Sequence, residues 1–170
     1  MPDNVKRMLE IKCNEARYRE LNHPLRRGLK AIRAFQHRYE GHKIFSDGEW
    51  GGLHYLVYGS EKHWRDSFDF AINVARITSI VGILHLDCAW AKWKMEQLNI
   101  GYSLETEMEF CLRTARASTL LLNYYASGIP FEIFLHHEEE PYEAYLFNPI
   151  RTIFEPFTIP LVEKNQIISS

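Results

Sequence analysis

Apolar side chains recur at helical spacing through the first part of the chain. Over 4–21 they fall three or four positions apart along one stripe, which predicts a first amphipathic helix. A second stripe predicts a helix over 24–40, with Pro24 in its first turn and Gly41 as its stop. The next stretch, 43–59, contains the turn-rich run SDGEWGG and alternates only weakly, so we expect a loop or a small hairpin there.

The most apolar part of the chain follows Ser60. Apolar residues surround most of the circumference of a helix drawn through 61–97, which predicts a long, buried central helix capped by Ser60. Another stripe predicts a helix that opens at Ser103 and stops before Gly128 and Pro130.

The spacing of apolar residues changes in the last quarter of the chain from a helical to a strand-like pattern. The runs FEIFL (131–135) and YEAYLF (142–147) predict a hairpin with an acidic tip. A helix through 131–147 is the alternative, which Pro141 opposes. Repeated prolines exclude a normal helix from the segment 148–170, whose apolar residues predict a packed, extended arm.

These elements predict a mainly α protein. We expect a bundle of four to five helices with a small C-terminal β-hairpin or irregular element and an extended C-terminal arm. Residues 1–147 would form a single helical domain that includes the hairpin, and 148–170 would form the arm, packed on the core or on a partner. A chain of 170 residues is long enough for one such domain.

The number and spacing of the cysteines indicate the cellular compartment and whether disulfide or zinc–thiolate sites are expected. The three cysteines, Cys13, Cys88 and Cys111, are odd in number and none lies in a CxxC pair. This predicts neither a disulfide framework nor a zinc–thiolate site, and it suits a reducing cytoplasm. We expect a cytoplasmic protein, because the N-terminus lacks the apolar core of a signal peptide and polar residues interrupt the apolar segment 70–90.

Charge is distributed unevenly, although the net charge is only −2. Residues 1–58 carry an excess of +4 and residues 127–170 an excess of −5. Such opposite surfaces steer partners even when the total charge is small. The residues that we expect to bind a protein partner are Arg26, Lys30, Arg33, Trp50, Glu138, Glu139, Glu140, Tyr142 and Glu143.

The leading interpretation is a non-enzymatic protein-binding module of the immunity or adaptor type. It rests on the two charged surfaces, on aromatic anchors such as Trp50 and on the absence of a specific catalytic motif. Enzymatic activity stays uncertain and is less favoured. The same two surfaces also allow copies of the chain to associate with one another.

Two alternatives come from other classes. The basic 26–43 helix places Arg33 four positions from His37 and Arg38 four positions from His42, an arrangement that suits nucleic-acid binding or metal-independent RNA cleavage. A small-molecule enzyme with a pocket around His85 is a further hypothesis.

Metal ligation is not expected, and no cofactor is predicted. A single ExxH run ends at His23, whereas di-iron bundles need two such runs. His136 and His137 adjoin an acidic tip that makes a poor preorganised cage. At a spacing of two on a helix, His85 and Asp87 point to different sides and cannot share one ion.

Overall fold

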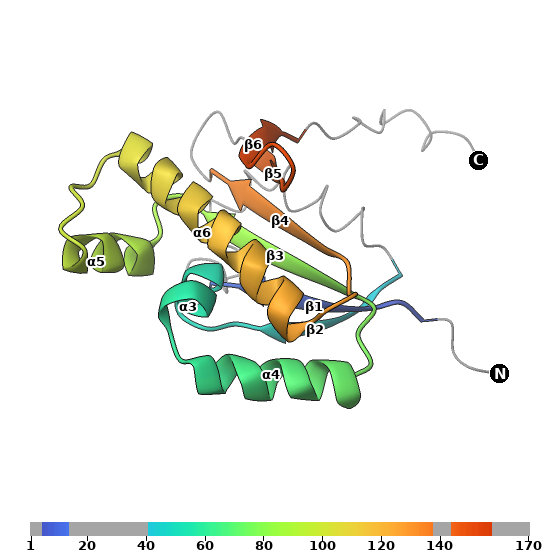
Figure 1. Cartoon of the computed structure of the whole chain (residues 1–170). Coiled ribbons are helices and arrows are strands. Elements are labelled where there is room, and N and C mark those ends of the chain that lie inside the picture. The colour runs from blue at the N-terminus through green and yellow to red at the C-terminus, as the bar shows by residue number, and fades with distance from the viewer. Residues whose placement is uncertain (1–4, 14–40, 138–143, 158–170) are drawn as a thin grey trace, which may run out of the picture.

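The structure is a computed structural model that describes residues 5–13, 41–137 and 144–157, and a six-stranded mixed sheet connects all three ranges (Figure 1). The predicted helical bundle is therefore wrong. The strands are β1 (Arg7–Lys12), β2 (Lys43–Asp47), β3 (Ser79–His85), β4 (Phe131–His136), β5 (Ala144–Asn148) and β6 (Ile153–Pro156). They lie in the order β2-β1-β3-β4-β5-β6. The first four are parallel, and β5 and β6 add antiparallel strands at one edge.

The order of the parallel strands reverses around β1. The chain passes from β1 to its neighbour β2 and then crosses to β3 on the opposite side of β1. Such a reversal opens a crevice at the carboxyl ends of the strands, where ligands of open α/β sheets bind.

Helices cover one face of this sheet. The helices of the described ranges are α3 (Leu53–Tyr58), α4 (Glu61–Asn73), α5 (Ala89–Gln97) and α6 (Leu104–Tyr125). In Figure 1, α3, α4 and α6 lie against the same face, whereas α5 lies apart, beyond the end of the sheet. None of the helices within the described ranges is long and apolar enough to cross a membrane.

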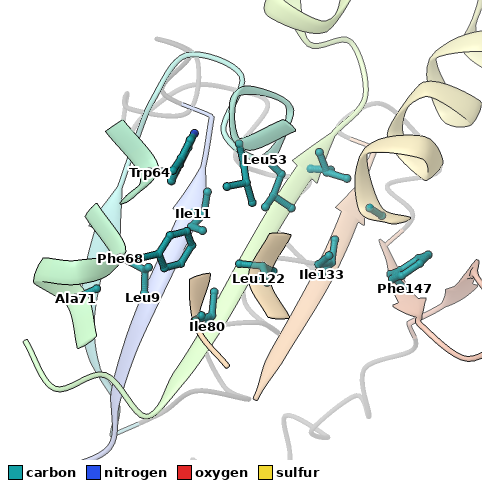
Figure 2. Packing of buried hydrophobic residues seen from close by; sticks show 14 of the residues in the cluster. Leu9, Ile11, Leu53, Trp64, Phe68, Ala71, Ile80, Leu122, Ile133 and Phe147 are labelled. Carbon is teal, nitrogen blue, oxygen red and sulfur yellow. The ribbon is translucent and has the colours of Figure 1, made fainter. Parts of the chain in front are cut away.

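The main core lies between these helices and the sheet. Figure 2 shows Trp64 and Phe68 of α4 packed over Leu9 and Ile11 of β1. Leu122 of α6 belongs to the same cluster of buried residues. Burying large side chains of this kind contributes roughly 1.5–3 kcal/mol each, so the core fixes the helices on the sheet.

The helix predicted over 4–21 is wrong for its described part, because residues 7–12 form β1. Met8, Leu9 and Ile11 are all buried, Met8 in a separate small cluster from Leu9 and Ile11. A parallel strand that is covered on both faces carries apolar side chains at successive positions, and these positions also fit a helical stripe.

The single long helix predicted over 61–97 is also wrong. The stretch instead forms α4, then β3 and then α5. Arg76 and Asp87, at the two breaks, adopt positive φ angles of 57° and 61°. Non-glycine residues seldom take this conformation, and neither break contains a glycine or a proline that would signal a turn.

Other elements agree better with the sequence pattern. Ser60 caps α4, and Ser103 caps α6 through a reciprocal capping box with Thr106. The strands predicted at 131–135 and 142–147 exist as β4 and β5, although they continue the large sheet.

The segment 43–59, expected to be a loop or hairpin, contains β2 and α3. The helix predicted over 24–40 lies outside the described residues.

The predicted C-terminal arm contributes a strand to the sheet. β6 pairs with β5 and ends at Pro156. Residues 158–170 of the arm lie outside the described residues.

Candidate metal centre

Three metal-ligating side chains converge at the carboxyl ends of β1 and β3. Cys13 directly follows β1, His85 is the last residue of β3, and Cys88 follows three positions later as the N-cap of α5. The two strands are adjacent and parallel, with Lys12 paired to Ile83. Their ends therefore meet at one edge, and the three donors lie in the crevice where the strand order reverses.

The spacing of the donors fits one metal ion. The Sγ atoms of Cys13 and Cys88 are 3.9 Å apart. The ligand atoms of Cys13, His85 and Cys88 all lie within 4.8 Å of one another, and the three residues are buried. Two sulfurs at about 2.3 Å from a tetrahedral zinc ion are about 3.8 Å apart. Two thiolates and an imidazole are also a donor set that selects zinc over hard cations. The residues therefore fit zinc.

The ring of His85 is oriented for metal ligation. Its Nδ1 lies 3.1 Å from the carbonyl oxygen of Leu86, which can only accept a hydrogen bond. Nδ1 therefore carries the proton, and Nε2 carries the lone pair that a metal ion needs.

The surroundings of Cys13 favour its thiolate. The side chain of Cys88 lowers the pKa of the Cys13 thiol most, and His85 and the backbone N–H of Gly51 lower it further, against the opposing effect of burial. That N–H donates to the Cys13 sulfur at 3.3 Å. The thiolate is the form that binds a metal ion.

Two glycines bring the turn after β2 close to Cys13. Gly51 and Gly52 have φ angles of +86° and +51°, in the region that glycine adopts most readily. A Cβ on Gly52 would lie 2.6 Å from the backbone nitrogen of Cys13, and one on Gly51 would lie 2.6 Å from the Trp90 ring. Only a residue without a side chain lets this turn reach the cluster.

Glu107 of α6 holds the turn that carries Cys88. Its carboxylate accepts the backbone N–H groups of Asp87 and Cys88, each at 2.9 Å, and the hydroxyl of Tyr102 at 3.0 Å. The residue is fully buried. These bonds fix the strained 86–88 turn, and a buried carboxylate with three donors is well satisfied.

The centre is enclosed by apolar side chains. Cys13 and Cys88 belong to a buried cluster with Ala91, Met95 and Phe110. A separate groove of about 550 Å³ lies along α6, and Phe110 also contributes to its wall. Phe110 thus belongs both to the apolar surroundings of the centre and to the groove.

Most of the side chains expected to act in binding or catalysis lie outside the described residues. They are Arg26, Lys30, Arg33, His37, Arg38, Glu138, Glu139, Glu140, Tyr142 and Glu143. Trp50 is described and exposed, one residue before Gly51. His42 is half-buried directly before β2 and does not belong to the cluster. Association with a protein partner or among copies therefore stays a prediction.

The sequence interpretation missed the three donors that converge. It placed His85 and Cys88 in one long helix over 61–97, and it considered His85 only together with Asp87, with which it cannot share an ion on a helix. The H-x-x-C spacing of His85 and Cys88 was the available signal, but the third donor lies far upstream. The expectation of no metal is thus opposed by a donor set that fits one.

Comparison with solved structures finds a similar fold in β-carbonic anhydrases. The β-carbonic anhydrase CcaA matches with a TM-score of 0.53 at 14% identity, over 90% of this chain and 78% of CcaA. A tetrameric β-carbonic anhydrase from Sordaria macrospora gives a TM-score of 0.46 at 11% identity, over 89% of this chain and 80% of that one. The β-carbonic anhydrase CafD from Aspergillus fumigatus gives a TM-score of 0.46 at 12% identity, over 86% of this chain and 92% of CafD. No family model and no curated protein matches the sequence.

The likeness to CcaA shows that the fold of this chain is that of the β-carbonic anhydrases. It corrects the interpretation as an immunity- or adaptor-like binding module, which depended on a helical bundle with two charged surfaces. The alternative of a nucleic-acid-binding or RNA-cleaving helical domain depended on the same bundle. The sequence left enzymatic activity uncertain and disfavoured it, yet proteins with this fold include enzymes.

Proposed function

We propose that this chain is a zinc-dependent enzyme that catalyses the reversible hydration of carbon dioxide. The observation that carries the proposal is the convergence of Cys13, His85 and Cys88 at the carboxyl edge of the sheet. The shared fold with CcaA, a protein described as a β-carbonic anhydrase, supports the choice of reaction.

The number and type of donors favour a catalytic centre. Catalytic zinc sites generally use three protein ligands, whereas structural sites use four. Within the described ranges, the cluster offers three. A zinc ion bound there would supply Lewis-acid activation of water at neutral pH.

The described residues around the centre have separate roles in this reaction. Glu107 holds the backbone of Cys88, and the carbonyl oxygen of Leu86 orients the His85 ring. Met95 and Phe110 exclude bulk water and offer an apolar wall to carbon dioxide. In the reaction, a water oxygen forms a bond to the carbon and one C=O π bond opens. One water proton leaves to the buffer, and the product is bicarbonate.

The test combines metal content with the rate of hydration. We expect the purified protein to contain zinc and to accelerate carbon dioxide hydration in a stopped-flow assay with a pH indicator. Cys88→Ser and His85→Ala should each remove one zinc ion per chain and abolish the acceleration. Cys111→Ala is the matched control, because Cys111 is a buried thiol outside the cluster and its loss should change neither quantity.

Two results would contradict the proposal in different ways. Unchanged zinc content in Cys88→Ser would refute the metal centre. Zinc that is lost from Cys88→Ser, together with a wild-type hydration rate equal to that of buffer, would keep the metal centre and refute the activity.

A further inference from the structure

A second cluster of metal-ligating side chains lies where β2 ends. Asp47 is the last residue of β2, Glu49 lies in the following turn, and His63 lies in the first turn of α4. Their ligand atoms are all within 4.8 Å of one another. None of the three residues belongs to the thiolate centre, and their donor chemistry differs, with two carboxylates and one imidazole.

The separations within this cluster suit an ion better than direct hydrogen bonds. The Nε2 atom of His63 lies 3.6 Å from Asp47 Oδ1 and 3.7 Å from Glu49 Oε1. Hydrogen bonds between such atoms are typically about 2.7–3.2 Å long. Ligands at about 2.1–2.2 Å from an octahedral divalent ion are about 3.0–3.1 Å apart when adjacent and about 4.2–4.4 Å apart when opposite, and the observed separations lie between these limits.

The Nε2 atom of His63 also supplies an independent indication of a ligand. It is buried as an atom, and it has no hydrogen-bond partner among the described residues. A buried polar atom without a partner costs about 1–3 kcal/mol. A cation between Nε2 and the two carboxylates would remove this cost and would also reduce the repulsion between the carboxylates.

Neighbouring side chains hold the donors in place. The Ser67 hydroxyl donates to the second carboxylate oxygen of Asp47. The rings of Tyr55 and Trp64 pack edge-on against His63, with centroids 5.8 Å and 4.9 Å away. Supporting contacts of this kind orient metal ligands and raise metal affinity.

We propose that Asp47, Glu49 and His63 bind a second divalent transition-metal ion, of the Mn²⁺ type. Two hard carboxylate oxygens with one imidazole suit Mn²⁺, whereas the thiolate centre selects softer ions. The backbone carbonyl of Glu49 accepts the N–H of Gly52, in the turn that reaches Cys13. The ion therefore ties this turn to α4 and acts as a structural clip next to the first centre.

The experiment titrates Mn²⁺ into metal-free, full-length protein and follows free Mn²⁺ by electron paramagnetic resonance. We expect one bound Mn²⁺ per chain, and at least about tenfold weaker binding for His63→Ala. Glu49→Gln, in the half-exposed turn, should weaken binding in the same direction and covers the case in which His63→Ala fails to fold. Glu61→Gln is the control, since it lies in the same turn of α4 and faces Arg65.

The second site and the proposed function fail in different ways. Cys88→Ser should keep its Mn²⁺ while losing zinc, so the Mn²⁺ titration is independent of the hydration assay. Wild-type affinity in both His63→Ala and Glu49→Gln would overturn the proposal. Mn²⁺ binding by wild type weaker than about 1 mM, a free energy of only about −4 kcal/mol, would also overturn it.

Discussion

Single side chains determine whether the candidate metal centre is preorganised. Glu107 contacts no proposed ligand atom, yet it accepts the backbone N–H groups of Asp87 and Cys88 from within the core. Asp87 holds a positive φ of 61°. A conformation of this kind costs about 1–3 kcal/mol and persists only where its surroundings impose it. Glu107 supplies that restraint, so the geometry of Cys88 depends on a residue of another element.

Glu107→Gln should therefore weaken both folding and metal binding. Glutamine has one acceptor oxygen, and its NH₂ group would face a backbone N–H. We expect the free energy of unfolding of the metal-free protein to fall by about 2–3 kcal/mol and zinc affinity to fall by about 10–100-fold. Urea unfolding and zinc competition with a chelator measure these changes.

Glu109→Gln is the matched control for that prediction. Glu109 lies two positions further along α6 and forms an exposed ion pair with Arg113. Pairs of this kind contribute about 0.3–0.5 kcal/mol, so stability should change little and zinc affinity should not change. Equal losses in the two variants would show that Glu107 has no special role in positioning the turn.

At the scale of elements, the close packing of α3 on β3 depends on Gly82. A Cβ on Gly82 would lie 2.4 Å from the Cδ1 atom of Leu53, which is fully buried. The first residue of α3 therefore packs directly against the backbone of the strand that ends in His85. The helix is short and does not hold itself in place, so this contact positions it.

A double-mutant cycle tests this packing. Gly82→Ala should destabilise the protein by about 1–3 kcal/mol through overpacking, and Leu53→Ala by about 2–5 kcal/mol through the cavity that it leaves. In the double variant the alanine at 82 partly fills that cavity, so the loss should be smaller than the sum of the single losses. Denaturant unfolding of the four proteins measures the cycle, and strict additivity would contradict the contact.

The elements also explain which parts of the fold the sequence revealed. α6 was predictable because Ser103 caps it and its half-exposed surface separates apolar from polar positions. β1 and β3 were not, because apolar residues on both strand faces obscure the alternation on which strand prediction depends. The breaks at Arg76 and Asp87 contain neither glycine nor proline. The candidate metal centre was missed for the same reason, since Cys13, His85 and Cys88 converge only when those two strands are recognised.

For the whole molecule, the buried histidine His54 makes stability depend on pH. Burial lowers the pKa of His54 from its ordinary 6.5 to about 3. Its Nδ1 pairs with the hydroxyl of Thr114 at 2.7 Å, and its ring stacks on Phe110. In the unfolded chain the imidazole gains a proton near pH 6.5, whereas in the folded protein it stays neutral until about pH 3.

The sign of the effect follows from that difference. The unfolded state binds more protons between pH 3 and 6.5. The contribution of His54 to the free energy of unfolding is therefore complete above pH 6.5 and is lost as the pH falls below it. Each pH unit within this window should cost about 1.4 kcal/mol. The free energy of unfolding of metal-free wild type should therefore fall more steeply than that of His54→Gln between about pH 6 and about pH 4.5, which lie inside this window. Parallel pH profiles of the unfolding free energy would contradict the prediction.

The parallel pairing of β1 with β3 also sets the order in which the molecule assembles. His85 and Cys88 lie in one short segment, but Cys13 is 75 positions away from Cys88. Parallel strands pair across long stretches of chain, which makes their assembly slow, whereas β4, β5 and β6 join through short connections. The complete donor set therefore exists only after the slowest contacts have formed. A metal ion at the proposed centre would therefore be taken up late, after folding, and would lock the two distant segments together and slow their separation.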